Sequence, residues 1–196
     1  MKKPFISFCF LFFISNTGIA QDSLKINALI LKANIFLTKN IRQYQFNMET
    51  MTKYKSQTNG FGLSLNYFPY LSTPSGEFRN TQSLSYRRYF YSSPISNKSN
   101  VYIAPYVKLI NRRAKEFGST GFAVFWPKDA KDFSANSVVL GLSSGFQISI
   151  YKGLIIVPHI GIGFGQVLNY TSKPNTVAPS LTHLDLEGLL QLGYRF

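Results

Sequence analysis

The chain has 196 residues, a length that suits one domain. Hydrophobic residues make up 45% of it and charged residues only 15%, which excludes a wholly disordered chain, and 21 Lys and Arg against 8 Asp and Glu give a formal net charge of +13. A single cysteine excludes a disulfide framework and a cysteine-based zinc site.

The first twenty residues have the pattern of a secretory signal peptide. Two lysines precede the apolar run Phe5–Ile14, and Gly18 and Ala20 occupy the −3 and −1 positions of a cleavage site before Gln21. A membrane anchor is the alternative, but a spanning helix needs about twenty apolar residues and this run is half as long. We therefore predict that residues 1–20 are cleaved and that residues 21–196 form the exported domain.

The next segments predict strands that become more regular along the chain. Leu24–Phe36 and Ile41–Lys53 have extended but poorly patterned sequences. Gly60–Tyr67 alternates apolar residues with Gly, Ser and Asn, which is the period-two pattern of a strand. Leu84–Phe90 alternates less cleanly, because Arg88 shares the face of the apolar residues.

Val101–Ile110 alternates too, although less regularly than the segments that follow. The strongest alternation is in the last three segments, where Val138–Tyr151 places apolar residues on one face and the Lys152-Gly153 turn separates it from Leu154–Asn169. In Thr182–Phe196, the histidine, both acids and the arginine share one face, and most leucines lie on the other. The total is about eight strands.

The composition of the polar faces indicates which face meets water. These faces are rich in Gly, Ser, Gln and Tyr, whereas a water-facing strand usually carries Lys, Glu and Thr. A narrow eight-stranded lumen must be filled by side chains, and the row Gly161, Gly163 and Gly165 leaves room for large neighbours. Aromatic residues also gather near the strand ends, as in the girdles of membrane barrels.

These patterns predict a single eight-stranded antiparallel up-and-down transmembrane β-barrel of the outer-membrane type. After the leader, the chain has no apolar run of about 18 residues, and only helices and closed barrels satisfy the backbone in lipid. The alternative is a soluble periplasmic β-protein, in which the apolar faces would be buried instead.

The connections predict two kinds of loop. Arg112–Asn136 reads as a long charged loop containing the apolar stretch Phe122–Trp126, and Tyr170–Ser180 as a second outer loop, whereas Leu71–Gly76 is short for one. Cations of the long loop could contact lipopolysaccharide phosphates. These candidates are Arg112, Arg113, Lys115, Lys128 and Lys131. Nucleic acid is not an expected partner, because the chain is exported and its basic residues form no single stripe.

Three segments carry a resemblance to a known family. Ser83–Phe90 reads SLSYRRYF, Val101–Tyr106 reads VYIAPY, and the chain ends in LGYRF. With the leader, they resemble a family of small outer-membrane β-barrels from Bacteroidota that is grouped as a domain of unknown function. The resemblance implies the fold and an outer-membrane location and carries over no catalytic residue. The terminal Phe196 resembles the signal that the barrel-assembly machinery reads during insertion.

Polar side chains on the inward faces form the candidate site. Buried charges need partners, so we predict that they form a structural network in the lumen. Its members are Arg87, Lys108, His159, His183, Asp185, Glu187 and Arg195. The alternative is a lipid-modifying enzyme, a deacylase or acyltransferase, with His183, Asp185 and Ser143 as a nucleophilic site. Residues two apart on a strand lie about 6.6–6.8 Å apart, which does not favour a direct His–carboxylate contact.

The sequence predicts neither a metal nor a cofactor. A metal site of His159, His183 and Asp185 is chemically permissible, but two histidines without a spacing motif do not indicate one. Our leading prediction is a non-catalytic outer-membrane protein that is structural or binds a surface ligand or partner through its extracellular loops. The expected partners are outer-membrane lipid, lipopolysaccharide and the assembly machinery. Conduction of small solutes is a further alternative.

Overall fold

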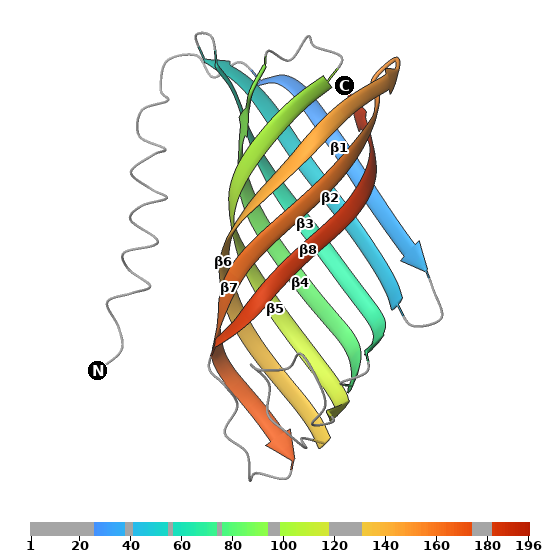
Figure 1. Cartoon of the computed structure of the whole chain (residues 1–196), viewed down its shortest axis with the longest axis vertical. Helices are drawn as coiled ribbons and strands as arrows, with labels where there is room; N and C mark the ends of the chain where they lie inside the picture. The colour runs from blue at the N-terminus through green and yellow to red at the C-terminus, as the bar shows by residue number, and fades with distance from the viewer. Residues whose placement is uncertain are drawn as a thin grey trace, which may run out of the picture.

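The computed structural model describes residues 26–37, 41–54, 57–73, 76–93, 99–117, 131–173 and 182–196. The predicted signal peptide lies outside the described residues. Eight antiparallel strands form one closed barrel in chain order (Figure 1). They are β1 (Ile26–Leu37), β2 (Ile41–Tyr54), β3 (Gln57–Thr73), β4 (Gly76–Tyr91), β5 (Ser99–Phe117), β6 (Lys131–Tyr151), β7 (Leu154–Lys173) and β8 (Thr182–Arg195). Within these ranges, no helix has the length and apolar character needed to cross a membrane.

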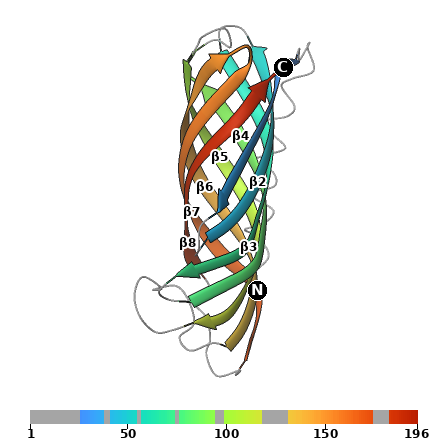
Figure 2. The same ribbon diagram turned by 90° about the vertical axis from the view of Figure 1, so that its right-hand side faces the viewer.

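The strand register fixes the width of the barrel. A path around the barrel can be drawn from Lys32 on β1 by moving at each strand to the paired residue of the next strand. This path ends at His183 on β8. The β8 residue that pairs with Lys32 directly is Gly193, ten positions farther along. A stagger of ten residues over eight strands corresponds to a tilt of about 41° and a backbone radius of about 8 Å. Figure 2 shows that the strands are inclined to the barrel axis. Side chains can fill a lumen of this radius.

The two ends of the barrel differ. At the end that we call the short-turn end, Lys152 and Gly153 connect β6 to β7 with φ values of 34° and 91°, as a type I′ turn requires. The C-terminus lies there too (Figure 1), and the amide of Phe196 donates to the carbonyl of Leu29 at 2.9 Å. The opposite end, the loop end, carries the connections 38–40, 74–75, 118–130 and 174–181.

Apolar side chains cover the outside of the barrel. Phe164 is 73% exposed on β7, whereas Lys32 on β1 is 1% exposed inside. Every strand contributes a large exposed apolar residue, for example Ile35, Phe46, Leu65, Leu84, Ile103, Leu142, Phe164 and Leu190. The interpretation that buries the apolar faces, and with it the soluble β-protein, is therefore wrong for this structure. The closed eight-stranded antiparallel barrel is confirmed.

The strands extend farther than their sequences indicate. The predicted loop Arg112–Asn136 begins and ends in strand, because β5 continues to Phe117 and β6 starts at Lys131. The predicted loop Leu71–Gly76 contains a connection of only two residues, and Tyr170–Ser180 starts within β7. The apolar alternation fades here while the hydrogen-bonded ladder continues, so periodicity marks the apolar part of a strand and misses its polar end.

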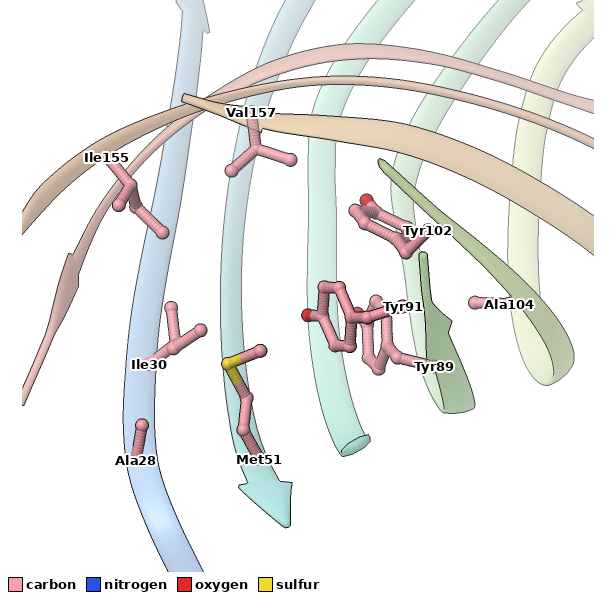
Figure 3. Packing of buried hydrophobic residues seen from close by; sticks show 9 residues of the cluster. All are labelled: Ala28, Ile30, Met51, Tyr89, Tyr91, Tyr102, Ala104, Ile155 and Val157. Atoms are coloured by element: carbon pink, nitrogen blue, oxygen red, sulfur yellow. The ribbon is translucent and has the colours of Figure 1, made fainter. Parts of the chain in front are cut away.

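Apolar and tyrosine side chains pack inside the barrel toward the short-turn end (Figure 3). The cluster consists of Ala28, Ile30, Met51, Tyr89, Tyr91, Tyr102, Ala104, Ile155 and Val157. The ring centroids of Tyr89 and Tyr102 are 5.0 Å apart in an edge-on arrangement, and Tyr91 lies 5.6 Å from Tyr102. Glycines make this packing possible, since a Cβ atom on Gly145 would collide with the Tyr102 ring.

Candidate functional site in the barrel lumen

An ion pair lies among the tyrosines near the short-turn end. The Lys32 Nζ atom is 2.5 Å from Glu49 Oε2, and both side chains are fully buried. The Tyr91 hydroxyl donates to the other oxygen of Glu49. The Lys32 ammonium also lies 5.0 Å from the Tyr89 ring centroid and 5.5 Å from that of Tyr102. Each charge is thus compensated, as burial requires.

A second group of charges surrounds Glu187 on β8. One carboxylate oxygen accepts from Arg87 Nη2 at 2.6 Å and lies 3.0 Å from His159 Nε2. The other oxygen lies 2.6 Å from Lys108 Nζ. His159 Nδ1 is 2.9 Å from the Tyr102 hydroxyl. A neutral imidazole with its proton on Nε2 satisfies both contacts, because it accepts from the phenol and donates to the carboxylate.

Asp185 extends this group toward the loop end. Its Oδ2 atom lies 2.5 Å from Lys108 Nζ and accepts a hydrogen bond from the Tyr106 hydroxyl at 3.1 Å. Its Oδ1 atom is 3.5 Å from Arg112 Nη2. We call Arg87, Lys108, Arg112, His159, Asp185 and Glu187 the Glu187 cluster. Its three cations and two carboxylates come from β4, β5 and β8 and cross the lumen from wall to wall.

The structure brings most of the predicted network together. Arg87, Lys108, His159, Asp185 and Glu187 meet in the Glu187 cluster.

Arg195 does not meet the carboxylates of the predicted network, which corrects that prediction. It is eight residues from Glu187 on the same strand, about 26 Å away, and its Nη2 atom is 3.4 Å from Ser149 Oγ near the short-turn end. The side chain faces inward as parity predicts, but position along the strand separates it from both carboxylates.

The residues of the enzyme alternative are not assembled. Ser143 is in register with Gly161 and Glu187, whereas His183 is in register with Gly165 and Val139. The four-residue offset separates Ser143 from His183 by about 13 Å along the strands, besides the strand between them. The Ser143 hydroxyl donates to the Ala104 carbonyl at 2.9 Å. The interpretation of His183, Asp185 and Ser143 as one nucleophilic site is therefore wrong.

The two histidines are also too far apart for a shared metal site. His159 pairs with Leu189, six positions from His183 on β8, which is about 20 Å along the strand. The His183 ring instead packs against Gly165, where an added Cβ atom would overlap it. No group of His, Cys, Asp and Glu in the described residues has the geometry to hold a metal ion.

The predicted surface cations are divided between the two sides of the barrel wall. Arg112 points into the lumen toward Asp185 with a side chain 15% exposed, so its assignment as a surface contact is wrong. Arg113, the next residue, is exposed on the outside. Lys115 and Lys131 belong to the loop-end parts of β5 and β6. Lys128 and the stretch Phe122–Trp126 lie outside the described residues.

The sequence pattern does not predict the ion pair of Lys32 and Glu49, because the first two strands are the least regularly patterned. A signal is nevertheless present in β2. Between residues 43 and 49, Gln43, Gln45, Asn47 and Glu49 alternate with Tyr44, Phe46 and Met48. The first set is buried and the second exposed, as in a strand with a polar interior face. Glu49 could thus have been assigned to the lumen, although its partner could not.

No protein-family model and no curated protein matches the chain, so its membership of the Bacteroidota family stays a prediction. Solved structures do resemble it. A major outer membrane protein from Thermus thermophilus superposes with a TM-score of 0.52 at 12% identity, over 86% of this chain and 99% of that one. Neisserial surface protein A gives a TM-score of 0.42 at 14% identity, over 86% of this chain and 91% of that one. The first likeness supports the eight-stranded barrel fold.

Proposed function

We propose that this chain is an integral outer-membrane barrel without catalysis, whose lumen is closed by its own side chains and whose partners bind at the loop end. The proposal rests on the distribution of side chains, which is the reverse of that in a soluble protein. The three acidic side chains that the structure describes, Glu49, Asp185 and Glu187, all point inward, while leucine, isoleucine and phenylalanine cover the outside. In water this arrangement would expose a continuous apolar surface, and in lipid it is the expected one.

The height of the apolar surface supports the same environment. On β8, Leu186, Leu190, Leu192, Tyr194 and Phe196 point outward and are between 44% and 66% exposed. The ten-residue rise from Leu186 to Phe196 corresponds to about 25 Å along the axis of a barrel with strands tilted by about 41°. The apolar band of an outer-membrane barrel has this height.

The filled lumen supports a structural role over conduction or catalysis. The Glu187 cluster occupies the middle of the barrel, and the layer of Tyr89, Tyr91 and Tyr102 lies between it and the short-turn end. Both carboxylates of the Glu187 cluster form ion pairs, and the predicted serine site is not assembled. Arg113, Lys115 and Lys131 belong to the loop-end parts of β5 and β6. Cations at this end can bind lipopolysaccharide phosphates, which supports binding there. The terminal Phe196 would serve the assembly machinery during insertion.

The test is a gel shift on isolated outer membranes, with boiled and unboiled samples compared in detergent. A closed barrel that resists cold detergent will migrate differently before and after boiling and will stay with the outer-membrane fraction. Edman sequencing of the same band should begin at Gln21 if the leader is cleaved as predicted. Recovery in the periplasmic soluble fraction without a shift would contradict the proposal.

A further inference from the structure

Arg88 is a charged residue on the apolar outer wall. It lies on β4 between the exposed residues Leu84 and Phe90 and is itself partly exposed. The outward-facing side chains described nearest to it on β3 and β5 are apolar except Asn59, which pairs with Phe90. The apolar ones are Phe61, Leu63, Val101, Ile103, Pro105 and Val107. A lipid-facing arginine destabilises a membrane barrel, most strongly at the midplane, so this position calls for a compensating contact.

Aromatic rings form a cradle for the Arg88 guanidinium. Its central carbon lies 5.2 Å from the Phe90 ring centroid and 5.6 Å from that of Phe61. Phe61 faces Arg88 across the strand pair and stacks on Tyr86 with a centroid distance of 6.3 Å. These ring faces stabilise the cation but accept no conventional hydrogen bond. The Arg88 Nε atom is buried without a hydrogen-bond partner among the described residues.

The Arg88 guanidinium contacts Phe90, which lies two residues nearer to the short-turn end, and β4 ends one residue later, at Tyr91. The exposed Ser92 follows, four residues from Arg88, or about 10 Å along the axis at a tilt of about 41°. A long arginine side chain can cover most of this distance and place its charge near the lipid headgroups.

We infer that Arg88, Phe61, Tyr86 and Phe90 form a binding site for the phosphate of a phospholipid in the membrane leaflet at the short-turn end. The guanidinium offers planar donors that match phosphate oxygens, and the neighbouring apolar wall accepts an acyl chain. A second copy of the chain is a poorer occupant, because the acidic side chains described all face the lumen and would leave Arg88 without a carboxylate. The inference rests on the proposed function, since it requires a bilayer around the barrel.

The test is native mass spectrometry of the full-length mature protein, folded in a sugar-headgroup detergent without phosphate and titrated with phosphatidylglycerol. The native protein should retain one phospholipid. Arg88→Gln should bind it about tenfold more weakly, because a hydrogen bond to a charged group is lost. Arg88→Lys should retain part of the affinity. The matched control is Arg42→Gln, which removes an exposed cation at the loop-end part of β2 and should bind like the native protein.

Three results would overturn the inference. In the first, Arg88→Gln retains the lipid as well as the native protein does. In the second, millimolar inorganic phosphate displaces the lipid completely, which would make the site a general anion site. In the third, a photo-crosslinking residue at position 61 gives a single protein adduct in cells instead of a lipid adduct. Each variant is first checked for the heat-dependent gel shift, so a failure of the barrel proposal is seen separately from a failure of this site.

Discussion

Replacing Glu187 by Gln should destabilise the barrel strongly although the side chain keeps its size. In the native protein, this carboxylate lies 2.6 Å from both Arg87 and Lys108 and 3.0 Å from His159. Lys108 keeps Asp185 as a partner, whereas Arg87 forms its described ion pair with Glu187 alone. Removing one partner of a buried ion pair costs about 3–5 kcal/mol, because a charge stays buried without compensation.

The measurement is equilibrium unfolding in urea with the protein in lipid vesicles, with the folded fraction read from migration without boiling. For a denaturant dependence of about 1–3 kcal/mol per molar urea, the midpoint should fall by at least about 1 M. Arg113→Gln is the control, because an exposed charge outside the apolar band should change stability by less than about 0.5 kcal/mol.

A double variant separates the loss of the ion pair from other effects of the substitution. Arg87→Met combined with Glu187→Gln removes both charges, so its cost should be clearly smaller than the sum of the two single costs. Additive costs, or a Glu187→Gln midpoint equal to that of the native protein, would refute the reasoning that the Glu187 cluster holds the barrel together by charge compensation.

Three further predictions follow from the packing of the wall and the lumen. Gly145→Ala should lower the unfolding free energy by about 1–3 kcal/mol, because its Cβ atom would overlap a tyrosine ring. Gly188→Ala should be tolerated, since nothing lies within 4 Å of its Cβ position. Equal urea midpoints for the two variants would contradict the described lumen packing. Lys32→Met should cost about 3–5 kcal/mol and the added Glu49→Gln should recover part of it, a pattern that a double-mutant cycle in urea will test. Leu190→Arg should cost about 2–4 kcal/mol in vesicles while Leu190→Phe is nearly neutral, and an equally small effect of both would show that this face does not meet lipid.

The alternation in the last strands was sufficient to place individual side chains. Parity places Asp185 and Glu187 on one face of their strand, and in the structure both carboxylates form ion pairs with Lys108. Parity succeeds because successive side chains of a strand point to opposite faces whatever the strand pairs with. The predicted role of glycine was also correct, since Gly163 lies beneath Tyr106, whose hydroxyl would be 2.7 Å from an added Cβ atom.

The alternation of side chains along a strand gives the face of each residue but not its height along the barrel. The wrong predictions for Arg195 and for the serine site follow from this. Arg195 and Glu187 share a face but are separated by about 26 Å, and Ser143 and His183 both face inward at different levels. The charged neighbours of Arg112 in the sequence predict a surface loop there, although β5 continues past it. Its inward direction follows from the same alternation once the strand is known to be longer.

The sequence by itself determined the number of strands, the face on which each regular side chain lies and the need for a narrow, filled lumen, because these depend on local periodicity and residue size. Only the tertiary structure decided which charges meet. The ten-residue stagger between β1 and β8 sets the level of every inward side chain, and it arises from pairing between distant strands. It brings Arg87 to Glu187, one hundred residues away, and leaves Arg88 on the outer wall beside Phe61 and Phe90.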